Sequence, residues 1–123
     1  MNALGKHLLL ELNDCDRLLL NDLDAVREIM LAAASESGVT VLGESFHRFS
    51  PQGVSGVLII AESHFTIHTW PEHGYAAADI FTCGNTVQPE KAAEVIIERF
   101  NPGSHSIVQM FRGMVEVKEK VAR

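Results

Sequence analysis

The sequence predicts a single α+β domain over residues 1–123, a two-layer α/β sandwich with two helices on one face of a mainly antiparallel sheet. The chain has 123 residues, 46% of them hydrophobic and 21% charged, which is typical of one globular core. Apolar residues recur at helical spacing in two segments, whereas β-branched and aromatic residues dominate most of the remainder. Proline-containing turns divide that β-rich part, which favours short antiparallel strands.

The first elements predicted are a strand and a helix. A short apolar run at residues 7–12 indicates the strand. The helix then begins after Asn21 or Asp22, which can act as its N-cap, and ends at Gly38. Its apolar residues share one face: Leu23, Val26, Ile29, Met30 and Ala33.

The middle of the chain predicts a four-stranded antiparallel meander. Its strands lie at residues 39–49, 54–61, 65–70 and 75–82. The turns at residues 50–53 and 71–74 contain proline, and a tight connection around residues 62–64 joins the two central strands.

The last elements predicted are a second helix and a final strand. Pro89 suits the first turn of a helix over residues 89–100, and Asn101-Pro102-Gly103 ends that helix. The final strand is expected at residues 107–117. The other face of the resulting sheet needs cover, which a second copy of the chain could provide.

Composition excludes several classes of partner. Ten basic and sixteen acidic residues give a net charge of -6, which argues against nucleic acid and weakly favours a small cationic ligand. The N-terminus lacks the charged segment followed by an apolar segment that is typical of a signal peptide. No apolar run approaches the roughly 20 residues that span a bilayer. A cytoplasmic protein without a membrane partner is expected.

The cysteines and histidines predict neither a disulfide nor a metal site. Cys15 and Cys83 are far apart in a chain expected in a reducing compartment, so both are expected as free thiols, and either could be chemically active. His64 and His68 share a strand face but lie about 13 Å apart along it, too far to bind one metal ion.

The Glu62-Ser63 peptide bond is the candidate site for a reaction of the backbone itself. A serine hydroxyl follows a carboxylate residue at a predicted hairpin connection, and His64 and His68 follow closely. Side chains alternate along a strand, so Ser63 and His68 would point to opposite faces of an uninterrupted strand. They can meet only if the chain turns or breaks near residue 63, and the hairpin supplies such a turn.

At these residues the sequence resembles the bacterial and archaeal family of S-adenosylmethionine decarboxylases, which are pyruvoyl enzymes of polyamine biosynthesis. The resemblance covers nearly the whole chain. It is carried by the motifs Gly5-Lys6-His7-Leu8, Phe46-His47-Arg48-Phe49, Gly53-Val54-Ser55-Gly56-Val57, Glu62-Ser63-His64, Ile67-His68-Thr69-Trp70-Pro71-Glu72, Gly74-Tyr75-Ala76 and Phe81-Thr82-Cys83-Gly84. So many ordered motifs are far more specific than a lone Glu-Ser dipeptide.

The resemblance implies a proenzyme that cuts itself between Glu62 and Ser63. Residues 1–62 would form the β chain and residues 63–123 the α chain, with Ser63 converted to a pyruvoyl group. By the same resemblance, His68 is the base for this processing and Ser55 assists it. A weak hydroxyl nucleophile needs such a base.

The resemblance also implies the reaction and its binding residues. The pyruvoyl ketone would act as the electron sink for decarboxylation of S-adenosylmethionine, giving the aminopropyl donor for spermidine synthesis. Cys83 would be the proton donor, Phe49 would stack on adenine, and Glu72 would hold the ribose hydroxyls, with Trp70 lining the pocket. The family pattern further implies a homodimer of α/β chain pairs with the sheets face to face and the active sites near the interface.

Two alternatives to this function remain at this point. Related pyruvoyl enzymes of the same fold decarboxylate arginine or ornithine, although Phe49 and Glu72 favour a nucleoside-bearing substrate. An uncut, non-catalytic paralogue that binds the ligand or activates a partner is the second. Singly, each candidate residue has an ordinary structural explanation, and His47, His64 and His73 are assigned no role.

Overall fold

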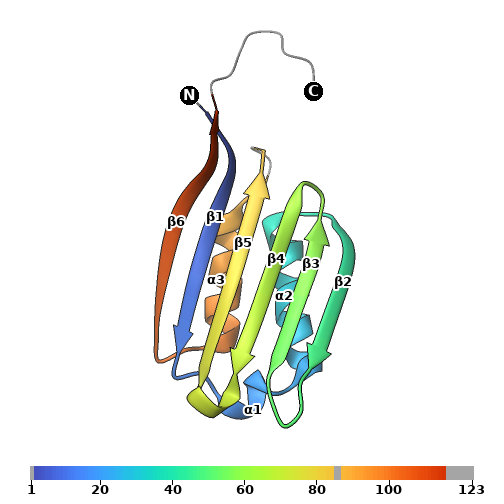
Figure 1. Ribbon diagram of the computed structural model, residues 1–123, viewed down its shortest axis with the longest axis vertical. Coiled ribbons are helices and arrows are strands. Elements are labelled where there is room, and N and C mark those ends of the chain that lie inside the picture. Colours follow the sequence, from blue (N-terminus) through green and yellow to red (C-terminus); the bar gives the residue numbers. More distant parts are fainter. Residues whose placement is uncertain (1, 85–86, 116–123) are drawn as a thin grey trace.

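A six-stranded antiparallel sheet forms one layer of the computed structural model, which describes residues 2–84 and 87–115 (Figure 1). The strand order is β2-β3-β4-β5-β1-β6. The strands are β1 (Asn2–Asn13), β2 (Val41–Arg48), β3 (Val54–Ile60), β4 (Ser63–Trp70), β5 (Tyr75–Cys83) and β6 (Ser104–Val115). The helices are α1 (Arg17–Leu20), α2 (Leu23–Ser37) and α3 (Pro89–Phe100), and a short 3₁₀ helix, η1 (Pro71–His73), joins β4 to β5.

The second layer consists of α2 and α3, which lie side by side on one face of the sheet (Figure 1). Alternate residues of the strands point into the space between the layers, as the regular burial pattern of β5 shows. The largest fully buried side chains include Leu10, Leu12, Met30, Leu58, Phe65, Ile67, Ile80, Ile96 and Phe100. The predicted α+β sandwich, with both long helices on one face, is confirmed.

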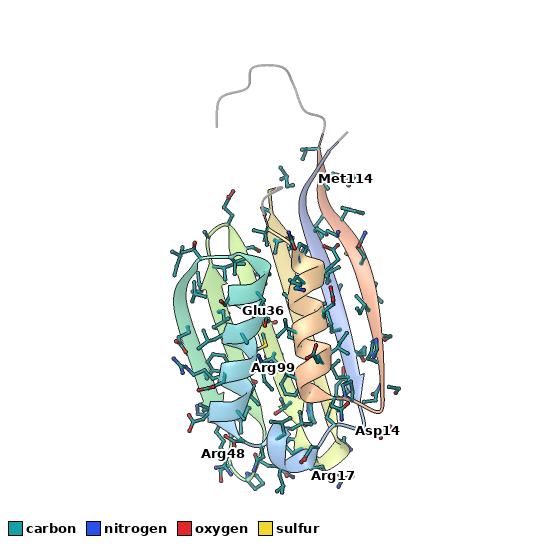
Figure 2. All side chains as sticks on the ribbon, turned by 180° about the vertical axis from the view of Figure 1, so that it is seen from behind. Asp14, Arg17, Glu36, Arg48, Arg99 and Met114 are labelled. Atoms are coloured by element: carbon teal, nitrogen blue, oxygen red, sulfur yellow. The ribbon has the colours of Figure 1, made fainter. Side chains whose placement is uncertain are left out.

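The two long helices begin and end at the residues that the sequence predicts. Asp22 caps α2, because its Oδ1 accepts a hydrogen bond from the Ala25 backbone N–H at 3.1 Å. Gly38 ends α2 with φ of 84°, a conformation that favours glycine. Side chains of the two helices also approach each other, with Arg99 Nη2 lying 4.0 Å from Glu36 Oε2 (Figure 2).

The outer elements differ from the prediction. The strand predicted at residues 7–12 extends over Asn2–Asn13, because β1 pairs with β5 on one side and β6 on the other, and the apolar run shows only its most buried part. The last strand starts at Ser104, three residues earlier than expected, and residues 116 and 117 lie outside the described residues. The four-residue helix α1 was not predicted, since one turn has no apolar periodicity.

The face of the sheet opposite the helices, here termed the open face, is uncovered by any helix among the described residues (Figure 1). It carries apolar side chains that are 40% to 56% exposed: Ile59, Trp70, Val108 and Met110. Apolar side chains gathered on one face of a sheet usually mark a contact surface. The open face is the sheet face that was expected to need cover.

Candidate active site

The Glu62-Ser63 bond lies in the two-residue turn between β3 and β4. Ile60 pairs with Ser63 across the hairpin, so Ala61 and Glu62 form the turn. Glu62 has φ of 67°, in the left-handed region where a side chain is sterically disfavoured by about 1–2 kcal/mol. The backbone is therefore strained at the residue that contributes the carbonyl of the candidate scissile bond.

Replacement of Glu62 by glycine is expected to relieve this strain. In an uncut Ser63→Ala background, Glu62→Gly should raise the free energy of unfolding by about 1 kcal/mol, because glycine adopts positive φ freely. Urea denaturation measures the change. Ala61→Gly is the matched control, since Ala61 has no positive φ and its replacement should be neutral or destabilising. Equal effects of the two variants would contradict the strain at Glu62.

Ser55 and His68 form a hydrogen-bonded pair on the open face. They are directly opposite each other in the β3–β4 register, and Ser55 Oγ lies 2.7 Å from His68 Nδ1. The pair, here termed the dyad, borders a groove with a volume of about 240 Å³. The groove is lined by Ser45, His47, Ser55, Gly56, Val57, Thr66 and His68. A serine hydroxyl in contact with an imidazole is an arrangement suited to proton transfer.

Ser63 and His68 do not meet within one chain. The predicted turn is present, but it ends at Glu62, and β4 continues without interruption from Ser63 to Trp70. At about 3.3 Å per residue, the two residues are roughly 17 Å apart along the strand. The expectation that the hairpin would bring them together in one chain is wrong, because the strand begins at Ser63 itself.

The candidate residues for substrate binding lie at the same end of the sheet as the dyad. Phe49 directly follows β2, Trp70 ends β4, and Glu72 lies in η1. All three side chains are exposed, and the Trp70 ring is 6.4 Å from that of His68 between centroids. The dyad and these three residues are termed the dyad end.

Cys83 lies at the opposite end of the sheet, with the Glu62-Ser63 bond. It is the last residue of β5, and Phe81, two residues before it, pairs with His64 on β4. Continuing this antiparallel register by two residues puts Cys83 beside Glu62. The group of Glu62, Ser63 and Cys83 is termed the cleavage end. The structure thus divides the predicted site residues between two ends of one sheet.

The two cysteines are both free thiols, as predicted, but their surroundings differ. Cys15 is 6% exposed, and burial, with a smaller contribution from Asp14, raises the pKa of its thiol from 9.0 to about 11. Cys83 is partly exposed on the open face. Because the thiolate is the nucleophile, Cys15 is the unreactive cysteine of the pair.

Alkylation is expected to distinguish the two thiols. At pH 8 iodoacetamide should modify Cys83 in the folded chain and leave Cys15 unmodified, because a thiol with a pKa of about 11 is almost entirely protonated there. Raising the pH from 9 toward 11 should also lower stability, since the unfolded chain ionises Cys15 before the folded chain does. Mass spectrometry of peptides after timed labelling measures the first effect. Faster labelling of Cys15 than of Cys83 would contradict it.

A polar network occupies the middle of the open face, between the two ends. Arg112 Nη1 lies 3.4 Å from His7 Nδ1, and His7 Nε2 lies 3.0 Å from Asp79 Oδ1. The Thr66 hydroxyl donates to Asp79 Oδ2 at 3.0 Å, and the Arg112 guanidinium lies over the Phe81 ring at 5.2 Å. No sequence motif indicates this network. Only the strand register brings together residues as far apart in the chain as His7 and Arg112.

The described residues contain no group of three His, Cys, Asp or Glu side chains that could hold a metal ion. In the same part of the chain, no helix is long and apolar enough to cross a membrane.

The fold and the site together define a two-layer α+β protein with a serine–histidine pair on an open sheet face. Residues 6–113 match the family model described as S-adenosylmethionine decarboxylase. The chain therefore belongs to the S-adenosylmethionine decarboxylase family. The resemblance found in the sequence and the enzyme class that it implied are both confirmed.

Individual relatives agree with this assignment. A protein of Thermodesulfovibrio yellowstonii named S-adenosylmethionine decarboxylase proenzyme is 53% identical over 115 residues, covering 94% of this chain and 85% of the relative. One of the same name from Acetivibrio thermocellus is 49% identical over 122 residues, covering 99% and 98%. The crystal structure of the adenosylmethionine decarboxylase from Aquifex aeolicus superposes with a TM-score of 0.90 at 33% identity, covering all of both chains.

Proposed function

We propose that this chain decarboxylates S-adenosylmethionine with a pyruvoyl group made from its own Ser63. The observation that carries the proposal is the strained Glu62-Ser63 turn, present in a chain whose relatives are named proenzymes. The product would donate the aminopropyl group for spermidine synthesis.

The self-cleavage would proceed in three balanced steps. The Ser63 hydroxyl attacks the Glu62 carbonyl carbon, so a C–O bond forms, the C–N bond breaks, and the amide becomes an ester with a free amine. A base then removes the Ser63 Cα proton, and the Cβ–O bond breaks to release residues 1–62 with a Glu62 carboxylate. Tautomerisation of the resulting dehydroalanine and hydrolysis by water release ammonia and leave the pyruvoyl group. Strain at Glu62 favours the first step, because the tight turn is relieved when the amide breaks.

The residues of the cleavage end fit a group formed at position 63. Ser63 is partly buried at the first position of β4, and the rest of that strand is held by pairing with β3 and β5, so the new chain end would stay in the sheet. The pyruvoyl ketone supplies an electron sink for the carbon that loses carbon dioxide. The partly exposed Cys83 is then the proposed proton donor to that carbon.

Two copies of the chain, packed with their open faces together, would complete each active site. Consider a two-fold axis that lies between the two sheets, perpendicular to the strands and near the middle of β4. It places the β4 strands of the two copies over each other, running in opposite directions. If the axis passes between Phe65 and Thr66, the Glu62-Ser63 turn of one copy lies opposite the dyad of the other, because residues 63 and 68 are equally far from that point. The Ser63 side chain has the parity of the helix-side residues of β4, but the backbone of the Glu62-Ser63 turn is at the end of the sheet. Sheets pack about 10 Å apart with interdigitating side chains, so the partner's imidazole would approach that turn from the open face. The proposed homodimer explains why Ser63 and the dyad lie at opposite ends.

In this arrangement the substrate would bind between the dyad end of one copy and the cleavage end of the other. The exposed Phe49 ring suits stacking on adenine, and the exposed Glu72 carboxylate suits the ribose hydroxyls. Trp70 and the excess of acidic residues suit the sulfonium cation. Arginine and ornithine have neither adenine nor ribose, so these residues favour S-adenosylmethionine.

Release of labelled carbon dioxide tests the substrate. Purified, fully cleaved protein is offered S-adenosylmethionine, arginine or ornithine, each labelled in the carboxyl carbon, and release from S-adenosylmethionine alone is expected. Release from arginine or ornithine alone would contradict the proposed substrate. No release from any of them by cleaved protein would contradict the decarboxylase function.

A further inference from the structure

We infer that His47 positions the dyad for chain cleavage by accepting the hydrogen of the Ser55 hydroxyl. The inference rests on the proposed self-cleavage. His47 and Ser55 are directly opposite each other on β2 and β3, and Ser55 and His68 are directly opposite each other on β3 and β4. The three residues therefore form one row across the open face, and all three line the same groove.

The hydrogen bond within the dyad can run in either direction, and only one direction leaves His68 a base toward a group other than Ser55. A serine hydroxyl has one hydrogen to donate and two lone pairs, and a neutral imidazole carries its hydrogen on one nitrogen. If Ser55 donates to His68 Nδ1, the hydrogen of the imidazole is on Nε2, and no lone pair remains for a proton from any group other than Ser55. If Ser55 accepts from Nδ1–H, then Nε2 is free as the base.

The tautomer of His68 with a free Nε2 requires another acceptor for the hydrogen of the Ser55 hydroxyl. Residues directly opposite in an antiparallel pair have Cβ atoms about 4.5–5.5 Å apart, so a His47 ring nitrogen can reach Ser55 by rotation about the side-chain bonds. The other polar residues of the groove, Ser45 and Thr66, are diagonal to Ser55, at about 7–8 Å. His47 is therefore the acceptor closest in register.

His47 also contacts a candidate binding residue. Its ring packs edge-on against the Phe49 ring, with centroids 4.6 Å apart and planes at 72°. Residues 47 and 49 are two apart along the chain, which places their side chains on one side of an extended strand. A single histidine thus lies next to both the dyad and the proposed adenine platform.

The tautomer of His68 provides the direct test. Uncut Ser63→Ala protein labelled with ¹⁵N-histidine should give His68 resonances of the form with a hydrogen on Nδ1 and a bare Nε2, identified by their loss in His68→Gln. His47→Leu should move His68 toward the other tautomer. His47→Gln should retain the first tautomer, because the amide oxygen can accept the same hydrogen. His105→Leu, which removes an exposed histidine of β6, should change nothing.

Cleavage kinetics in the Ser63 chain provide the second readout. His47→Leu should slow cleavage on the order of 10- to 100-fold, the range found when a hydrogen-bond partner behind a metal-bound histidine is removed, and His47→Gln should restore most of the rate. Wild-type cleavage in His47→Leu with an unchanged His68 tautomer would overturn the inference. So would equal slowing in His47→Leu and His47→Gln without a change of tautomer, which indicates a packing role. If the wild-type chain is never cut, the proposed function fails, and the tautomers of the uncut proteins still decide whether His47 accepts the Ser55 hydrogen.

Discussion

Ser63→Ala is expected to leave one uncut chain of 13.5 kDa, whereas the wild-type chain should separate into residues 1–62 and residues 63–123. Alanine has no hydroxyl to attack the Glu62 carbonyl, so neither the ester nor any later species can form. The loss should be complete, because no other residue can supply an oxygen at that position. Intact mass spectrometry of the denatured protein measures it, and the downstream fragment should carry the mass of a pyruvoyl end instead of serine.

A second serine substitution separates this effect from a general loss of stability. Ser35→Ala changes an exposed serine of α2 on the helical layer and should leave cleavage at the wild-type rate. The Ser63→Ala chain should remain folded, since residue 63 is the first residue of β4 and the other residues of β4 still pair with β3. A wild-type chain that stays whole under all conditions, or a Ser63→Ala chain that is still cut after Glu62, would contradict self-processing.

Local sequence signals predicted most of the fold. Asp22 and Gly38 bound α2 because capping depends on a few neighbouring residues, and the proline-containing turns separate β2 from β3 and β4 from β5 for the same reason. The position of β1 between β5 and β6 depends on pairing across the whole chain, which no local pattern reveals. That pairing determines where the outer strands begin and end.

The sequence alone proposes the residues of the candidate site but does not predict their arrangement. The motifs identified Ser55, Ser63, His68 and Cys83, and side-chain alternation correctly put Ser63 and His68 on different faces of β4. A turn near Ser63 was expected to bring the two side chains together in one chain. That expectation is wrong because both residues belong to one continuous strand, in which they lie roughly 17 Å apart. The sequence alone assigns His47 no role, because its position opposite Ser55 depends on the β2–β3 register.

A mixture of two inactive chains is expected to restore cleavage, because the proposed dimer places Ser63 of one copy against the dyad of the other. His68→Ala alone and Ser63→Ala alone should both stay uncut. When they are co-expressed, the Ser63 of a His68→Ala chain meets an intact dyad on its Ser63→Ala partner. Random pairing puts about half of the His68→Ala chains in mixed dimers, so cleavage of up to roughly half of them is expected. Mass spectrometry identifies the chain that was cut.

The matched control removes the dyad from both partners. Co-expression of His68→Ala with a chain carrying both Ser63→Ala and His68→Ala provides no His68 in any dimer, so no cleavage is expected. If a chain used its own dyad, the His68→Ala chain would remain whole with either partner, and the composite site would be wrong. Restoration with the single variant but not with the double variant has no explanation within one chain, because the roughly 17 Å between Ser63 and His68 along β4 is fixed by the strand itself.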